Sequence, residues 1–381
     1  GVRLVGSEMC IRDRSSKMST DILRIIEGGL ANDKRKIINY AIRLAERLKA
    51  DGDVQLSKCI VEQIESSTHK NVATADAMRM VPLDMDSKLQ IVEIVPENSN
   101  RADIVLSNMV QKQVEEFIKL IKNDTELELA GLNIRKSLLL YGAPGCGKTS
   151  IAHYISEKTG LPLVVSRLDA IVSSLLGSTA KNLSRIFSYV NSMPCILLLD
   201  EFDALAKARD DNHELGELKR VINSLLQNID SMSPSTVLIA ATNHPDLLDK
   251  AVWRRFYTRL EVGLPDEDSR KQIVRNTLKG FKCVILEDEN RMKIISELMA
   301  DLSPSDICTI LTKLKVKSII DGSKEINYEQ ILASIYEFGG KDEPMDNFIV
   351  YLNTYGVTQN TISKMLNISI RQVRNALSDK K

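Results

Sequence analysis

The spacing of apolar residues divides the chain into a helical beginning, an alternating middle and a helical end. Between residues 21 and 64 the apolar positions recur three and four residues apart, which predicts a helical hairpin or small bundle. From about residue 104 to Pro265, short apolar runs alternate with helical patterns, which predicts an α/β fold with a parallel sheet covered by helices on both faces. Beyond Pro265 the pattern is helical to about Phe338, and another helical segment follows the break at 339–344.

Changes of pattern set the segment boundaries that we predict. Residues 1–17 resemble translated sequencing adapter more than protein, so we expect a non-native leader with Met18 as the natural start. The helical region after it is either an adaptor for a partner or an arm packed on the main domain. The other predicted segments are an N-terminal helical region (18–66), a linker with a small β element (67–103), the α/β domain (104–265), an all-α lid (266–340) and a small helical tail (344–381).

Composition narrows the partners and the compartment. Lys+Arg and Asp+Glu both number 51, so nucleic acid or a membrane surface could be recognised only by a local patch. No apolar run approaches the roughly 18–20 residues that a membrane helix needs, so we expect no membrane partner. The six cysteines form no CxxC pair and no zinc-ligand spacing, which predicts no cysteine-bound metal and a reducing, cytoplasmic location.

A glycine-rich segment lies between the apolar run 137–141 and a helical run. Gly142–Thr149 (GAPGCGKT) fits the pattern GxxxxGK[ST] in the strand–loop–helix context that binds nucleoside triphosphates. Its glycines let backbone N–H groups face the phosphates, and the helix N-terminus favours an anion. Lys148 would reach the β- and γ-phosphates, and the Thr149 hydroxyl would ligate Mg²⁺. The residues expected to contact ATP here are Gly142, Pro144, Gly145, Cys146, Gly147, Lys148, Thr149 and Ser150.

Two further apolar runs end in polar residues that suit a phosphate site. The run 196–199 ends in Asp200 and Glu201; Asp200 would contact the nucleotide and hold Mg²⁺, and Glu201 would be the general base for the attacking water. The run 236–242 ends in Asn243, whose amide can hold the same water. Because the carboxyl ends of parallel strands form the binding edge of such a sheet, we expect these side chains beside the glycine-rich loop.

Together these motifs resemble those of the AAA+ ATPases, a family of P-loop NTPases. The resemblance covers about residues 104–333, with Gly142–Thr149 as Walker A, Ile196–Asp203 as Walker B and Asn243 as sensor 1. It implies hydrolysis of ATP to ADP and phosphate, with Mg²⁺, in a ring of like subunits that is expected to be a hexamer. It also implies a protein substrate.

The resemblance extends to arginines that would act on a neighbouring subunit. By position in the family pattern, Arg254 and Arg255 are candidates for arginine fingers, which reach the ATP site of the next subunit. The segment 302–310, where Ser303 and Pro304 suit a helix cap and first turn, contains no arginine, so the sensor 2 residue of many AAA+ proteins is missing. This departure is typical of the AAA branch of unfoldases and of microtubule- or membrane-remodelling motors.

A loop after the second strand resembles the central-pore loop of the family. Leu175 occupies the position where an aromatic residue grips a translocating polypeptide, and Leu176 and Gly177 follow it. An aliphatic side chain can still insert along an extended chain, although it buries less area than an aromatic ring. The alternative is a packed strand-to-helix loop with Leu175 in the core.

The tail has a pattern of helix, tight turn and helix between residues 355 and 377. It resembles the helix-turn-helix of DNA-binding proteins, with Arg371, Gln372, Arg374 and Asn375 as candidates for contact with nucleic acid. From Pro344 onward five basic residues stand against two acidic ones, a local balance of 5 − 2 = +3. The same geometry also serves as a protein scaffold, so DNA binding and partner docking both remain open.

Three hypotheses follow for the use of ATP hydrolysis. The first is remodelling or unfolding of a protein substrate, with the N-terminal helices as adaptor. The second is a nucleic-acid-associated regulator that binds DNA through residues 344–381. The third is an ATP-driven switch that controls a partner enzyme. Lys148 and Glu201 together argue against an inactive ATPase in all three.

Overall fold

The computed structural model describes residues 91–95, 104–168, 176–204, 215–340 and 344–378, together with scattered residues between 22 and 82. Contacts divide the chain into two units, residues 1–81 and 82–381. In the first unit the described residues at positions 40–49 and 55–60 are helical, as the apolar spacing predicts. There the Ser57 hydroxyl donates to the Ala45 carbonyl oxygen at 2.7 Å. The predicted leader lies outside the described residues.

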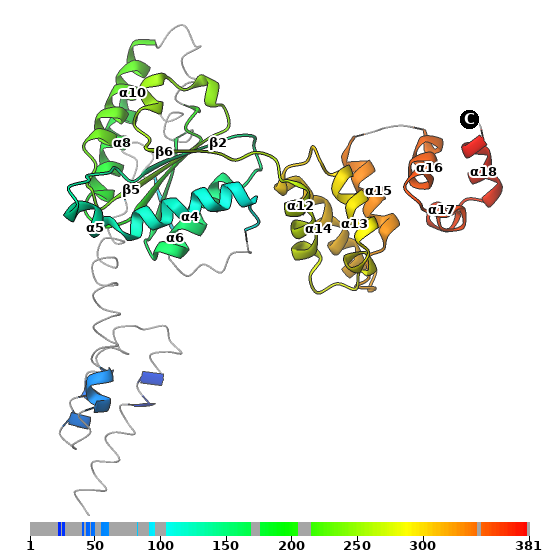
Figure 1. Ribbon diagram of the computed structural model, residues 1–381, viewed down its shortest axis with the longest axis horizontal. Coiled ribbons are helices and arrows are strands. Elements are labelled where there is room, and N and C mark those ends of the chain that lie inside the picture. Colours follow the sequence, from blue (N-terminus) through cyan, green and yellow to red (C-terminus); the bar gives the residue numbers. More distant parts are fainter. Residues whose placement is uncertain are drawn as a thin grey trace, which may run out of the picture. The chain divides into compact units, whose positions relative to one another are not determined.

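The second unit is built on one six-stranded sheet (Figure 1). Its strand order is β1-β3-β4-β5-β2-β6, and every pairing is parallel except that of β1 with β3. The two central strands β4 and β5 consist of apolar residues buried on both faces, apart from their last polar residues. The strands are β1 (Glu93–Val95), β2 (Ser137–Tyr141), β3 (Leu163–Arg167), β4 (Ile196–Asp200), β5 (Val237–Thr242) and β6 (Thr258–Glu261).

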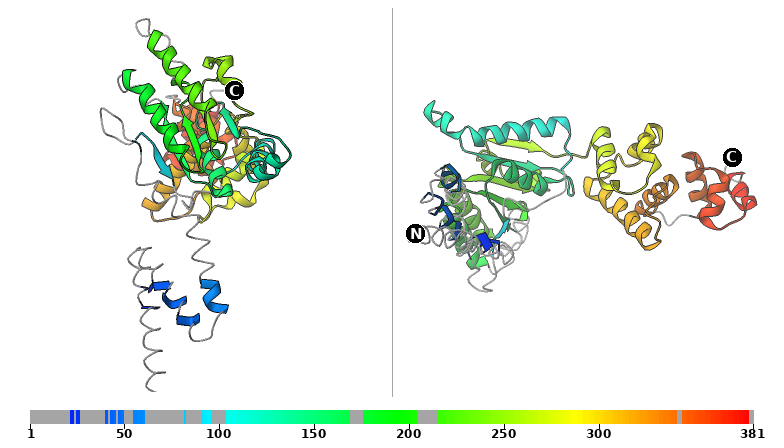
Figure 2. Two further views of the ribbon diagram at one scale, coloured as in Figure 1. Left: turned by 90° about the vertical axis from the view of Figure 1, so that its left-hand side faces the viewer. Right: turned by 90° about the horizontal axis from the view of Figure 1, so that it is seen from below.

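Helices cover both faces of this sheet, so the predicted α/β class is confirmed (Figure 2). On one face, α4 (Asn108–Lys122) and α6 (Lys148–Thr159) share a core with apolar residues of the strands. On the other face, α8 (Leu176–Val190) and α10 (Leu215–Asp230) pack side by side. Short elements complete this part: α5 (Asp124–Leu129), η3 (Pro245–Leu247) and α11 (Lys250–Trp253).

Strand β1 shows where the sequence interpretation was incomplete. The small β element was expected to lie within a linker, residues 67–103. Instead, Glu93–Val95 pairs antiparallel with β3 and extends the main sheet at its edge, with Val95 buried in the α4–α6 core. A three-residue strand is too short to carry a periodic signal, and its place depends on a partner some 70 residues away in the sequence.

The lid is helical, as predicted, and its helix starts are capped by side chains. Asp266 accepts from the Ser269 backbone N–H, and Ser303 with Asp306 forms a capping box at a helix whose first residue is Pro304. The predicted cap at Ser303 is therefore confirmed. The lid consists of α12 (Glu267–Leu278), η4 (Val284–Glu287), α13 (Glu289–Leu298), α14 (Pro304–Ile320) and α15 (Tyr328–Phe338).

The tail folds as three short helices: α16 (Met345–Thr354), α17 (Gln359–Leu366) and α18 (Ile370–Ser378). Their buried residues belong to the same hydrophobic cluster as those of the lid. At the junction, the Tyr336 ring lies against Phe348 and Tyr351, with centroids 4.9 and 4.8 Å apart. The Tyr328 hydroxyl donates to the Tyr355 carbonyl oxygen at 3.0 Å. Within the part of the chain that the structure describes, no helix is long and apolar enough to span a membrane.

Candidate nucleotide site

The loop between β2 and α6 is curled by glycines. Gly142, Gly145 and Gly147 have φ values of 141°, 74° and 96°. The Lys148 ammonium is buried and donates to the carbonyl oxygens of Gly142 and Ala143, both at 2.8 Å. Burial lowers the pKa of Lys148, and the nearby Cys146, Asp200 and Asp203 oppose that shift. The lysine is therefore folded onto its own loop, where a phosphate could take the place of the two carbonyl groups.

Oxygen ligands suited to Mg²⁺ come together where β4 ends. The Thr149 hydroxyl at the start of α6 donates to Asp200 Oδ2 at 2.9 Å. The other carboxylate oxygen of Asp200 accepts from the backbone N–H of Glu201 at 2.9 Å. A hydroxyl and a carboxylate are hard oxygen donors of the kind that Mg²⁺ takes. These contacts bring together residues that are 51 positions apart in the sequence.

The ends of β4 and β5 are joined by a buried carboxyl group. Asp203, which is 3% exposed, accepts from the Thr242 hydroxyl at 2.9 Å and from the Asn243 backbone N–H at 3.2 Å. These bonds hold Asn243 at the same sheet edge as Asp200 and Glu201. The sequence interpretation placed Asp203 in the Walker B segment without a role and gave none to Thr242. The only signal in the sequence was that Asp203 is a further acidic residue after the end of β4, and this does not reveal that Thr242 and Asn243 bind it.

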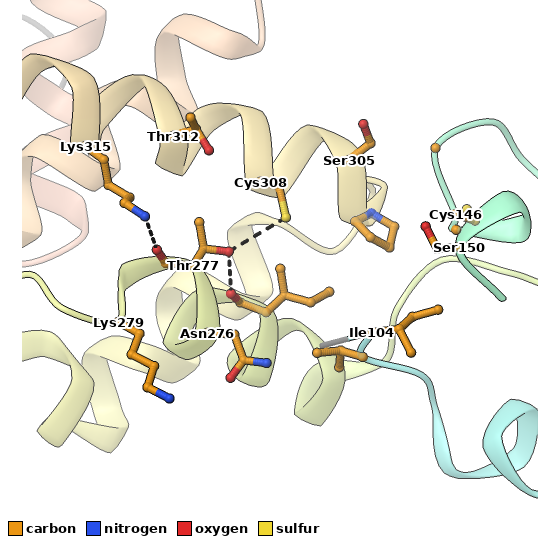
Figure 3. A pocket seen from close by; sticks show the side chains of 15 residues that line it. Ile104, Cys146, Ser150, Asn276, Thr277, Lys279, Ser305, Cys308, Thr312 and Lys315 are labelled. Carbon is orange, nitrogen blue, oxygen red and sulfur yellow. Dashed lines mark hydrogen bonds between the residues drawn. The ribbon is translucent and has the colours of Figure 1, made fainter. Parts of the chain in front are cut away.

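A cavity of about 680 Å³ lies beside the glycine-rich loop, between the loop, the segment before α4 and the lid (Figure 3). Its size is within the range of small-molecule sites. The Lys315 ammonium donates to the Thr277 carbonyl oxygen at 2.9 Å, which joins the two lid helices that form one wall. The lining residues from the loop and α6 are Gly145, Cys146, Gly147 and Ser150; those from elsewhere include Ile104, Val105, Asn276, Thr277, Ser305 and Cys308.

The capped N-terminus of α14 touches the loop directly. The Ser305 backbone N–H donates to the Gly145 carbonyl oxygen at 3.2 Å. A Cβ on Gly145 would lie 2.6 Å from Ser303 Oγ and 3.1 Å from Ser305 Cβ. The lid therefore contributes a helix N-terminus, and no arginine, at the place where the missing sensor 2 residue was noted. Burial raises the pKa of the Cys146 thiol in this contact, and Lys148 lowers it to a lesser extent.

The two finger candidates differ in their contacts. Arg255 donates to the Ala251 carbonyl oxygen at 2.8 Å and pairs with Asp230 at 3.1 Å, so its guanidinium is half-buried against its own subunit. Arg254 is exposed, and within the described residues its side chain forms no hydrogen bond or ion pair. The Ser137 hydroxyl of β2 donates to the Arg255 carbonyl oxygen at 2.9 Å, which fixes this turn to the sheet.

The remaining candidates are not part of this cavity. Leu175 lies outside the described residues, and Leu176 and Gly177 begin α8 with side chains that are not described. Arg371, Gln372, Arg374 and Asn375 all lie on α18, apart from the cavity lining. Among the described residues no group of three His, Cys, Asp or Glu side chains could hold a metal ion.

A mostly parallel sheet, in which strand β2 leads through a glycine-rich loop into helix α6 beside the acidic end of β4, defines a P-loop NTPase. Comparison with known proteins narrows the class, because residues 138–264 match the family described as "ATPase family associated with various cellular activities (AAA)". Residues 138–264 therefore form an ATPase domain of the AAA family. The matched region ends before the tail and lends no support to a DNA-binding role there.

Three relatives illustrate the range of the similarity. A Sinorhizobium fredii protein named uncharacterized AAA family ATPase y4kL is 39% identical over 201 residues, 53% of this chain and 61% of the relative. The ATP-dependent zinc metalloprotease FtsH 2 of Symbiobacterium thermophilum is 29% identical over 238 residues, 60% of this chain and 40% of its own. The proteasome-activating nucleotidase of Methanococcus vannielii is 27% identical over 335 residues, which are 84% of this chain and 77% of the relative. The chain thus spans less than two thirds of the first two.

Proposed function

We propose that this AAA family ATPase couples hydrolysis of Mg-ATP, in a ring of like subunits, to the remodelling or unfolding of a protein substrate. The observation that carries the catalytic part is the meeting of Lys148, Thr149, Asp200 and Asn243 at one sheet edge beside a cavity. The Mg²⁺ held by Thr149 and Asp200 would neutralise charge on the β- and γ-phosphates.

Each residue at this edge has a separate task. The Lys148 ammonium exchanges its two loop carbonyl partners for phosphate oxygens, a gain because the lysine is already desolvated. Glu201, which follows Asp200 with φ of 54°, takes a proton from the attacking water. The Asn243 amide orients that water, and its own position depends on Asp203. The lid closes the cavity over the nucleoside through the N-terminus of α14.

Surface features support assembly with further copies. Arg254 is an exposed guanidinium with no partner among the described residues, as a group that acts on a neighbour requires. An apolar patch on α14 is exposed beside Lys313 and Lys317, and one at α5 is exposed beside Glu126 and Glu128. The first patch consists of Val316, Ile319 and Ile320, and the second of Leu129 and Leu132. One apolar patch is flanked by lysines and the other by glutamates, so the two suit a head-to-tail contact between copies, which can close into a ring.

Protein remodelling is favoured by the printed names of the relatives. One relative activates a proteasome and another is an ATP-dependent protease, so both names refer to protein breakdown. We extend to this chain only the shared step, ATP-driven handling of a polypeptide, with Leu175 as the residue that would grip it. Leu175→Ala would then lower remodelling of an unstructured test protein while ATP turnover persists. An unaffected remodelling rate would favour the third hypothesis, a switch acting on a partner enzyme.

The ring is tested by mixing inactive subunits. Arg254→Ala and Arg255→Ala each keep their own Walker residues, whereas Glu201→Gln keeps both arginines. The variant that lacks the finger should lose on the order of 10³-fold in turnover. Mixed in equal amounts with Glu201→Gln, it should regain about a quarter of wild-type turnover, because a quarter of the sites combine an intact base with a neighbour's finger. A ring with fingers in trans would be refuted by two results together. Wild-type ATP turnover per subunit would not depend on protein concentration, and neither arginine variant would regain turnover when mixed with Glu201→Gln. Arg275→Ala, an exposed lid arginine paired with Glu289, serves as the control.

A further inference from the structure

Each of the three tail helices contributes buried residues to the hydrophobic cluster that the tail shares with the lid. Ile349 and Leu352 of α16, Ile362 of α17 and Val373 and Ala376 of α18 are all 4% exposed or less. The helix α18 packs against both α16 and α17. It is therefore held from two sides, so its outward face has a defined orientation within the tail.

The turn between α17 and α18 is fixed by side-chain hydrogen bonds. Asn367 ends α17 in the left-handed conformation, with φ of 52°, and the Ser363 hydroxyl donates to the Ile368 carbonyl oxygen at 2.5 Å. Gln372 accepts from the Ser369 backbone N–H at 2.9 Å and its own N–H donates to the Ser369 hydroxyl at 3.3 Å. This reciprocal cap lies at the start of α18 and uses the side-chain amide oxygen of Gln372. The side-chain oxygen of Gln372 therefore caps the helix, and contact of this exposed residue with nucleic acid stays a prediction.

The outward face of α18 carries a polar stripe. Arg371, Arg374, Asn375 and Ser378 are exposed and follow at spacings of three, four and seven residues, so they share one side of the helix. From residue 359 to 378 the sequence contains three basic residues and no acidic one. Arg374 Nε contacts Gln359 Oε1 at 3.4 Å, which steadies the guanidinium and leaves it exposed. Such a stripe is positively charged and rigidly held.

The contacts with the lid use other parts of the tail. Phe348 and Tyr351 of α16 and the following Tyr355 form the aromatic junction with the lid, and the Tyr351 and Tyr355 rings lie 4.9 Å apart. Met365 of α17 lines a second cavity, of about 230 Å³, with residues of α14 and α15. The polar stripe of α18 stays exposed when these contacts are made.

We propose that this stripe binds double-stranded DNA, with α18 lying in the major groove. The nine residues of α18 form a helix about 13 Å long. The major groove is about 12 Å wide and can hold an α-helix whose exposed face points toward the bases. Arginine pairs with the O6 and N7 atoms of guanine, and asparagine with the N6 and N7 atoms of adenine, so Arg371, Arg374 and Asn375 match base edges and phosphates. Lys364 on α17 adds a cation for the backbone. Because residues 359–378 include no acidic one, this convex stripe suits a grooved polyanion better than an acidic peptide.

This proposal is independent of the ATP-dependent function and is tested on the full chain. Binding of a fluorescein-labelled random-sequence duplex is measured by anisotropy over a range of KCl concentrations. The double variant Arg371→Ala/Arg374→Ala should bind about tenfold or more weakly, with a log–log salt slope smaller by about 2. Asn375→Asp, which keeps the size and adds a negative charge, should weaken binding at least as strongly.

The controls separate loss of contact from loss of fold. Lys112→Ala/Lys119→Ala removes the same charge from the exposed face of α4 and should leave the affinity within about twofold of wild type. ATP turnover of the α18 variants should equal that of wild type, which shows that they are folded. A wild-type chain that does not bind the duplex would overturn the proposal. Equal binding by the α18 variants and the α4 control would also overturn it, and an acidic protein partner would then be the occupant to seek.

Discussion

Gly142 and Gly147 are a matched pair that separates backbone strain from steric overlap in the phosphate loop. Both have positive φ, at 141° and 96°. A Cβ on Gly147 would have no atom within 4 Å, whereas a Cβ on Gly142 would lie 2.2 Å from the Val262 carbonyl oxygen. Gly147→Ala therefore adds only conformational strain, whereas Gly142→Ala adds conformational strain together with an overlap.

The structure sets the size of both effects. A non-glycine residue in a left-handed conformation costs about 1–2 kcal/mol, which is the whole expected loss for Gly147→Ala. Carbon and carbonyl oxygen ordinarily approach no closer than about 3.3 Å, so the Gly142 contact is about 1 Å too short. The Val262 backbone cannot easily retreat, because its N–H donates to the Tyr141 carbonyl oxygen at 2.7 Å. Overlap of this kind adds about 1–3 kcal/mol, so Gly142→Ala should lose about 2–5 kcal/mol in total.

Urea unfolding, followed by circular dichroism, measures both losses relative to wild type. The informative quantity is the difference in stability between the two variants, because both carry strain from positive φ and only Gly142→Ala adds an overlap. Gly142→Ala should be the less stable by about 1–3 kcal/mol. Equal stability of the two variants would refute the reasoning, since it would mean that the Val262 carbonyl group is not held against the loop.

Three further changes test contacts at the β5 end, the lid–tail junction and β4. Thr242→Val removes a hydroxyl donor from Asp203 and should lower both stability, by about 1–3 kcal/mol in a urea titration, and ATP turnover. Tyr328→Phe removes the bond to the Tyr355 carbonyl oxygen and should cost about 1 kcal/mol, with faster hydrogen exchange in the tail. Burial raises the pKa of Cys195 from 9.0 to about 12. The unfolded chain therefore releases this proton first, and stability falls between these pH values by about 1.4 kcal/mol per unit, a slope that Cys195→Ala should remove.

Each of these predictions has a matched control. Thr236→Val removes a hydroxyl bond to the Val190 carbonyl oxygen, and it should leave turnover unchanged. Tyr257→Phe alters an exposed tyrosine and should not change the exchange of the tail. Cys308→Ala removes an exposed thiol and should leave the alkaline slope as in wild type. The reasoning fails for any pair in which the control changes as much as the test variant.

Local chemistry made the α/β class and the phosphate loop predictable from the sequence. The glycines of 142–149, the strand before them and the helix after them are neighbours in the chain, so the pattern and the structure coincide. The same holds for the Ser303 cap, which involves a residue only three positions away. Such features depend on a few consecutive residues, and their chemistry can be read directly.

Contacts between distant segments could not be predicted in this way. The wall of the cavity combines Ile104 with residues of two lid helices, and no pattern in the sequence links them. The difference between Arg254 and Arg255 depends on Asp230, which lies 25 positions away from Arg255. Glutamine is a residue type that can pair with bases, and only the hydrogen bonds between Gln372 and Ser369 show that this side chain caps the helix.

The lid connects the nucleotide cavity with the tail through packed residues. The N-terminus of α14 meets the loop at Gly145, and further along α14 the buried Ile310 and Leu314 belong to the hydrophobic cluster that also holds the tail residue Leu352. Close-packed interiors shift as units, because they have no free volume to absorb a displacement. If α14 moves when the cavity fills or empties, α15 and, through the Tyr336 junction, the three tail helices would be displaced with it. If α18 binds DNA as proposed, nucleotide and DNA affinities are linked, and each must alter the other by the same factor.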